Sequence, residues 1–135
     1  MEDTLITFKT AKLAKEKGFN IFTDVCFANT PNSDNKQYKK IKLHHSHSVG
    51  SVDSFGNILT IVAYAPTQSL LAKWLREEHS LHITINIGLP HNHFIMYYSN
   101  VIKFGKHHKS KFKSEFYKTY EEAYEIGLYQ ALLLL

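Results

Sequence analysis

The hydrophobic positions of residues 65–87 change their period from helical to alternating. In the first part they recur three and four residues apart on one face, which predicts a helix over residues 67–79. In the second part every other position is apolar, which predicts a half-buried strand over residues 81–87. The apolar positions are Leu70, Leu71, Trp74 and Leu75 in the helix and Leu81, Ile83, Ile85 and Ile87 in the strand.

The ends and the core of this helix–strand unit follow from residue type. Pro66 suits the first helical position, and Thr67 can cap free backbone N–H groups. Trp74, the only tryptophan, is expected to anchor the core, with stacking on a ligand as the alternative. We expect the inward strand positions to be buried and the polar ones to be more exposed. The inward pair is Ile83 and Ile85, and the polar pair is Thr84 and Asn86.

A second strong helix signal covers residues 120–135. Thr119 and Glu122 have the spacing of a capping box. Small residues recur every four positions behind it, and such a ridge lets a helix lie close to a sheet. The ridge is Ala123, Gly127 and Ala131, and the buried stripe beside it is Leu128, Leu132 and Leu135.

The remaining patterns complete an α+β domain. A short helix is expected from Thr7 or Phe8 to Lys17, with Gly18 as its left-handed C-cap. Further strands are expected over residues 21–27, 38–49, 58–64, 94–104 and 111–118. Short connections favour a mainly antiparallel sheet, in one layer, covered by the helices of residues 67–79 and 120–135. The predicted core is Leu71, Trp74, Leu75, Ile83, Ile85, Gly127 and Leu128.

The composition limits the number of domains, the cellular compartment and the partners that can be expected. The 135 residues suit one domain over residues 1–135, and 44% of them are hydrophobic. The chain has no long apolar run and no signal-peptide pattern, so no membrane partner is expected. Cys26 is the only cysteine, which favours a reducing cytoplasm. The net charge of +4 permits an anionic partner.

Three stretches carry a resemblance to a known family. They are residues 65–83, from Ala-Pro-Thr-Gln to Leu-His-Ile, residues 117–128, Tyr-Lys-Thr-Tyr-Glu-Glu-Ala-Tyr-Glu-Ile-Gly-Leu, and residues 15–19, Lys-Glu-Lys-Gly-Phe. Together they resemble a set of small uncharacterised proteins from bacteriophages and prophages of Bacteroidetes. The resemblance implies a phage or mobile-element origin, hence the cytoplasm of a bacterial host, and a small α+β fold. It implies no activity and brings no catalytic residues.

Histidine is the residue type most able to carry chemistry here, with nine copies. Pairs two residues apart on a strand share a face and can bind zinc or nickel. The candidate ligands are His45, His47, His91 and His93. No acidic or thiolate ligand lies near them in the sequence, so no metal or other cofactor is assigned. His79 and His82 are expected to make local hydrogen bonds. No nucleophile elbow, phosphate loop or dinucleotide fingerprint occurs, and no catalytic residue is singled out.

Two lysine tracts, over residues 36–47 and 103–113, give the clearest functional signal. In the second tract Phe104 and Phe112 interleave with the lysines, and basic residues among aromatics can bind nucleic acid. The alternative is that edge lysines keep sheets from aggregating. The candidate residues are Lys39, Lys40, Lys42, Lys106, Lys109, Lys111 and Lys113.

These patterns support three functional hypotheses. The first is a non-catalytic accessory protein that binds a host or phage macromolecule. The second is nucleic-acid binding through the two lysine tracts. The third is a small enzyme, or a nucleotide-sequestering protein, in which histidines such as His82, His91 and His93 would converge.

Overall fold

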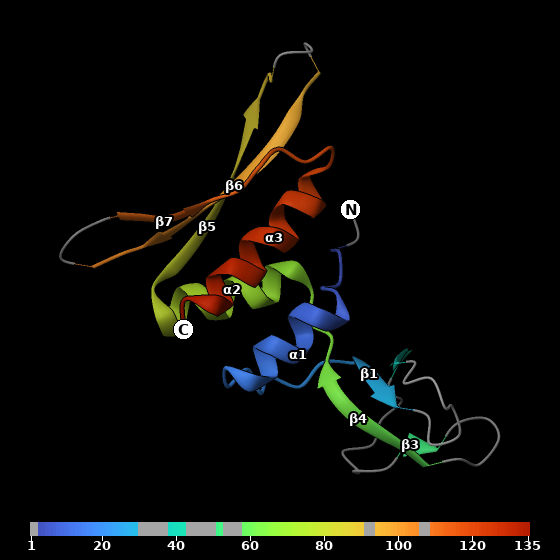
Figure 1. The fold of residues 1–135 in the computed structure, drawn as a ribbon. Coiled ribbons are helices and arrows are strands. Elements are labelled where there is room, and N and C mark those ends of the chain that lie inside the picture. The colour runs from blue at the N-terminus through green and yellow to red at the C-terminus, as the bar shows by residue number, and fades with distance from the viewer. Residues whose placement is uncertain (1–2, 30–37, 43–50, 53–57, 91–93, 106–108) are drawn as a thin grey trace. The chain divides into compact units, whose positions relative to one another are not determined.

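A computed structural model describes residues 3–29, 38–42, 51–52, 58–90, 94–105 and 109–135 (Figure 1). These residues form three helices and seven strands, and every strand pairing among them is antiparallel. The α+β fold class is therefore confirmed. The described chain divides into two compact units, residues 5–66 and residues 1–4 with 67–135. The expectation of one domain over residues 1–135 stays a prediction.

The elements alternate along the chain. The helices are α1 (Phe8–Glu16), α2 (Gln68–His79) and α3 (Tyr120–Leu133). The strands are β1 (Val25–Asn29), β2 (Tyr38–Lys42), β3 (Ser51–Val52), β4 (Ile58–Tyr64), β5 (Leu81–Gly88), β6 (Met96–Lys103) and β7 (Lys109–Lys113). The predicted helices are thus all present. The strand expected from residue 21 begins only at Val25, and the one expected from residue 111 begins at Lys109.

The unit of residues 5–66 is a sheet in the order β2-β1-β4-β3 with α1 packed against β4. The rings of Phe8 on α1 and Phe27 on β1 meet edge to face, with centroids 5.3 Å apart. Helix α1 ends as its sequence predicts. Gly18 has a φ of 96°, and the Phe19 N–H donates to the Ala14 carbonyl over 2.9 Å.

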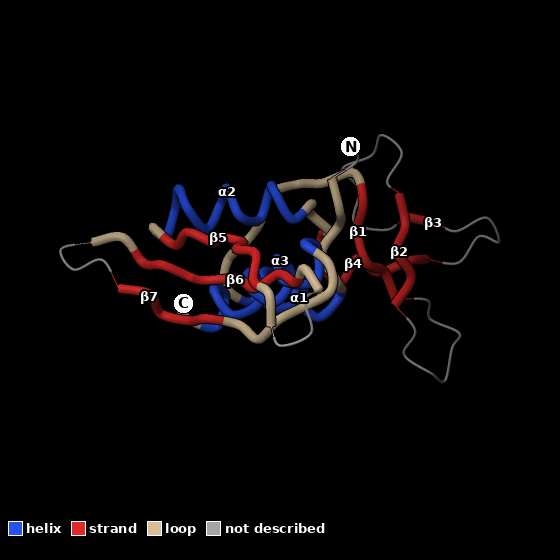
Figure 2. Tube along the Cα trace, turned by 90° about the horizontal axis from the view of Figure 1, so that it is seen from above, coloured by secondary structure: helices blue, strands red, loops and turns tan. Residues whose placement is uncertain are grey.

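The other unit contains a separate three-stranded sheet in the order β5-β6-β7 (Figure 2). Strands β5 and β6 form a long hairpin whose register runs from Leu81 opposite Lys103 to Gly88 opposite Met96. Helix α3 contacts both strands, and α2 contacts β5 and α3. The expectation of one sheet layer is wrong, because within the described ranges the strands before α2 and those after it form two different sheets.

Helix α2 begins two residues after the proline that was expected at its first position. The Thr67 hydroxyl accepts a hydrogen bond from the Leu70 N–H over 3.2 Å, which makes Thr67 the N-cap and leaves Pro66 outside the helix. Leu71 and Leu75 are fully buried, and Trp74 is 9% exposed. Ser80 ends the helix in the left-handed conformation, with a φ of 56°, so the chain reverses into β5 within one residue.

Helix α3 lies with its backbone directly on the sheet. Its capping box is present, with the Thr119 hydroxyl and the Glu122 carboxylate each accepting from the other residue's N–H. A Cβ added at Gly127 would lie 2.8 Å from the Ile83 Cγ2 and 2.9 Å from the Ser99 Cβ. Only glycine leaves room for this approach. The neighbouring residues Ala123, Leu128, Ala131 and Leu132 are fully buried.

The cover provided by α3 is shorter than the sequence suggests. Figure 1 shows the far end of the β5–β6 hairpin extending past this helix. Ile87, near that end, is 65% exposed, and Ile83 and Ile85 are only half-buried, contrary to the expectation. Asn86 is half-buried, like the two isoleucines, and only Thr84 is exposed as expected. The last residue of the expected stripe, Leu135, is also exposed, because α3 ends at Leu133.

Candidate nucleic-acid interface

The β5–β6–β7 sheet has two different faces. Ile83 and Ser99 face Gly127 of α3, which defines the covered face. Because side chains alternate along a strand, the neighbouring positions His82 and Tyr98 lie on the other face. We call this second surface the open face. Its described members are His82, Thr84, Asn86, Met96, Tyr98, Asn100, Ile102 and Lys113, and none of them is fully buried.

Strand β7 contributes Lys113 to the open face. Lys113 pairs with Asn100, and its ammonium lies 4.7 Å from the centre of the Tyr98 ring. A register shift between Val101 and Ile102 leaves Lys111 as the extra residue of a bulge. Both lysine side chains are exposed. The edge strand therefore carries cations beside an aromatic ring.

Aromatic rings lie at both ends of the open face. His82 and Phe104 meet edge to face with ring centroids 4.3 Å apart. Tyr98 and Phe116 meet in the same way at 5.3 Å. Phe104 is 43% exposed and Phe116 is 40% exposed, so each presents a large apolar area to solvent.

The sheet contains no negatively charged side chain. Residues 79–114 include no aspartate or glutamate. The same segment has the five lysines Lys103, Lys106, Lys109, Lys111 and Lys113. A polyanion approaching this sheet would therefore meet cations without competing carboxylates on its strands.

The structure separates the lysines that the sequence grouped as candidates. Lys111 and Lys113 belong to the sheet just described, and Lys109 starts the same strand. Lys39, Lys40 and Lys42 belong to β2 in the other unit, where the Lys40 side chain is exposed. Lys106 lies outside the described residues.

The aromatic residues that accompany the lysines differ from those expected. Phe112 pairs with the fully buried Val101, so its register places it on the covered face. Phe104 alone of the expected pair contributes to the open face, together with Tyr98 and Phe116. The alternation of β6 could have placed Tyr98 there. Phe116 follows β7, and no local pattern marks it.

The candidate metal ligands are not placed by this structure. His45, His47, His91 and His93 lie outside the described residues. Within the described ranges no group of three or more metal-binding side chains converges. His79 meets the Trp74 ring at 4.5 Å, and its Nε2 is buried with no hydrogen-bond partner among the described residues. Aromatic contacts of His79 and His82 are thus a role that the sequence did not predict.

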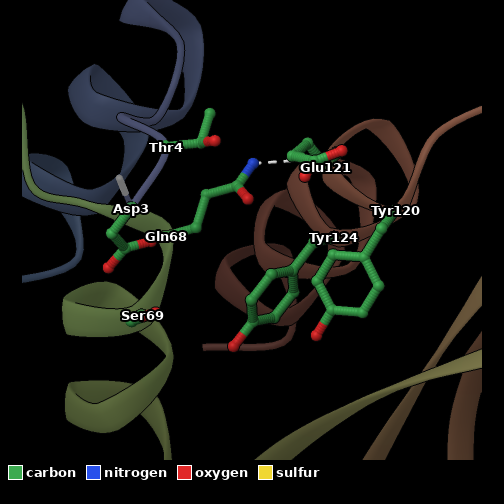
Figure 3. A pocket seen from close by; sticks show the side chains of 7 residues that line it. All are labelled: Asp3, Thr4, Gln68, Ser69, Tyr120, Glu121 and Tyr124. Carbon is green, nitrogen blue, oxygen red and sulfur yellow. Dashed lines mark hydrogen bonds between the residues drawn. The ribbon is translucent and has the colours of Figure 1, made fainter. Parts of the chain in front are cut away.

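A small hollow lies between the starts of α2 and α3 and residues 3–4 (Figure 3). Its volume is about 340 Å³, and its lining is Asp3, Thr4, Gln68, Ser69, Tyr120, Glu121 and Tyr124. The buried Gln68 amide donates to the Glu121 carbonyl over 3.0 Å and to a Glu125 carboxylate oxygen over 3.3 Å. Burial, followed by the nearby Tyr120 and Asp3, raises the pKa of Tyr124. These hydrogen bonds join the two helices.

A cluster of apolar side chains is exposed at the far end of the β5–β6 hairpin. Its described members are Ile87, Leu89, Phe94 and Ile95, each more than half exposed. Apolar groups gathered in this way are typical of a contact surface. Nothing in the sequence indicated that these residues are exposed, because apolar and polar positions alternate in the same way whether or not a helix covers the strand.

Among the helices of the described residues, none combines the length and the apolar character needed to cross a bilayer. No known protein family, curated protein or solved structure is significantly similar to the chain. The function is therefore argued from the residues of the sites above, and the resemblance to phage proteins stays a prediction.

Proposed function

We propose that this protein is a non-catalytic module that binds nucleic acid through the open face of the β5–β6–β7 sheet. The observation that carries the proposal is the ammonium of the exposed Lys113 over the Tyr98 ring, with the exposed Lys111 on the same strand of a sheet that has no carboxylates. Lysines neutralise phosphates and release counterions, which supplies most of the affinity of sequence-independent binding.

The proposal is tested by the salt dependence of binding. Fluorescence anisotropy of a labelled oligonucleotide is measured with the purified protein across a range of salt concentrations. The affinity should fall steeply as salt rises, with a log–log slope of about −0.7 for each phosphate contacted on a single strand. Replacing two contacting lysines should reduce that slope by roughly 1.4.

The variant is Lys111→Glu with Lys113→Glu. Its charge-matched control is Lys12→Glu with Lys73→Glu, which changes exposed lysines on α1 and α2 by the same amount. Only the first variant should lose affinity at low salt. Absence of binding by the unaltered protein at low salt, or an equal loss in both variants, would contradict the proposal.

A second candidate is the broader hypothesis of an accessory protein that binds another host or phage protein. The exposed apolar cluster at the end of the hairpin favours it. Affinity purification from host cells should then recover a specific protein with the unaltered chain. Leu89→Lys combined with Phe94→Lys should abolish that recovery and leave the oligonucleotide affinity unchanged.

The hypothesis of an enzyme stays third. Of its three histidines, only His82 lies among the described residues, and its ring is engaged with Phe104. No carboxylate is among the described members of the open face.

A further inference from the structure

We infer that the nucleic acid bound by the open face is single-stranded, and that two of its bases stack on Phe104 and Phe116 at the two ends of the face. This inference rests on the proposed function and deepens it. It assigns a role to rings that an interface made only of lysines would not need.

The two phenylalanines follow the ends of β6 and β7, and contacts with the sheet hold their rings. The Phe104 N–H donates to the Ser80 carbonyl over 3.0 Å, and its ring meets His82. Phe116 lies over Gly88, where a Cβ would overlap the ring, and it forms an edge-to-face pair with Tyr98. Each ring is thus supported by a neighbour, yet keeps two fifths of its area exposed.

The separation of the rings sets the length of strand that can reach both. Phe116 meets Tyr98, which lies six positions from Phe104 on the same side of β6. At about 3.3 Å per strand residue this separation is roughly 20 Å. A strand that advances about 3.4 Å per nucleotide covers it in about six steps, and a more extended strand covers it in fewer.

Stacking requires a base whose face is free. In a duplex the base faces are covered by their neighbours, whereas a single strand can unstack and place successive bases on aromatic side chains. Lys113 pairs with Asn100 between the two rings and is positioned to contact a phosphate that joins the stacked bases, and the exposed Lys111 lies in the bulge beside it. Because all bases have a π-face, the site should tolerate any sequence.

The experiment compares ligands and matched variants by fluorescence anisotropy at one low salt concentration. The ligands are oligothymidylates of two to twelve nucleotides, a duplex of twelve base pairs, and a single strand of twelve abasic residues. Affinity should rise steeply up to about seven nucleotides and slowly thereafter. The duplex and the abasic strand should bind more weakly than the oligothymidylate of twelve residues.

The variants are Phe104→Leu and Phe116→Leu, each expected to weaken binding of the twelve-nucleotide strand at least about fivefold. The control is Phe22→Leu, a phenylalanine of similar exposure in the other unit. Binding of the abasic strand should change in none of them. Circular dichroism melting establishes that each variant is folded.

The outcomes separate this inference from the proposed function. If the unaltered protein binds duplex and abasic strands as tightly as oligothymidylate, and the two variants match the control, the stacking inference is wrong while the lysine interface stands. If no ligand binds at low salt, both are wrong.

Discussion

The two faces of the β5–β6–β7 sheet differ in how closely they are packed, although the same strands supply both. On the covered face, Ser99 and Val101 are fully buried beneath α3, and even one added carbon at Gly127 has no space. On the open face, Thr84 and Lys113 are exposed, and the rings meet one another at their edges. The alternation of a strand thus lets stability and binding depend on different residues of the same segment.

The largest loss of stability is expected from Trp74→Ala in the helix that packs on β5. Removing a buried aromatic side chain from a close-packed core costs about 3–5 kcal/mol of unfolding free energy. Chemical denaturation monitored by circular dichroism measures this value. A loss below about 1 kcal/mol, as for an exposed residue, would show that Trp74 does not anchor the core.

Gly127→Leu should break the contact between α3 and the covered face. The added side chain must displace Ile83 and Ser99, and overpacking of this kind costs about 1–3 kcal/mol. Gly127→Ala serves as the graded control and should lose less, because only its Cβ must be accommodated. Equal stability of all three proteins in urea denaturation would contradict the described approach of helix and sheet.

A pair of serines on the covered face gives a sharper test of how that face is stabilised. The Ser114 hydroxyl accepts from the Ser99 N–H over 2.8 Å and donates to the Glu115 carbonyl over 2.7 Å. Ser114→Ala leaves that buried N–H without this acceptor, which should cost about 1–3 kcal/mol.

The matched change, Ser99→Ala, should be nearly neutral, because the Ser99 hydroxyl is buried with no hydrogen-bond partner among the described residues. Both free energies come from the same denaturant titration. A Ser99→Ala variant that is destabilised as much as Ser114→Ala would mean that the hydroxyl has a bonded partner.

The smallest effect is expected on the open face. Thr84→Ala replaces an exposed side chain that accepts one long hydrogen bond from Asn86, so stability should change by less than about 0.5 kcal/mol. Differential scanning calorimetry should show nearly the same melting temperature as for the unaltered protein. A large shift would indicate that this face is packed within the folded chain.

Local signals predicted the helices well. The caps at Thr67, Gly18, Thr119 and Glu122 each act through residues a few positions away, so the sequence contains the whole interaction. The division into two sheets was not predictable in this way. It depends on which strands pair at long range, and alternation alone does not select a partner.

The candidate site was predicted only in part for the same reason. Lys111 and Lys113 were identifiable from charge. Phe116 reaches Tyr98 only because the chain after β7 turns back over Gly88. The extra residue in the bulge at Lys111 turns the following residues of β7 to the opposite face of the sheet. Phe112 therefore lies on the covered face, whereas Phe104 lies on the open face.

The order of sheet and helix along the chain has a consequence for biosynthesis. Strands β5 and β6 leave the ribosome before α3, which supplies the cover of their apolar face. At about 5–20 residues per second, the nascent hairpin waits on the order of seconds for Gly127 and the leucines beside it. During that interval Ile83 and Val101 lack the cover of α3, and a chaperone that holds extended apolar segments would protect them. Ribosomes stalled before residue 120 should therefore display a hairpin that is prone to aggregation.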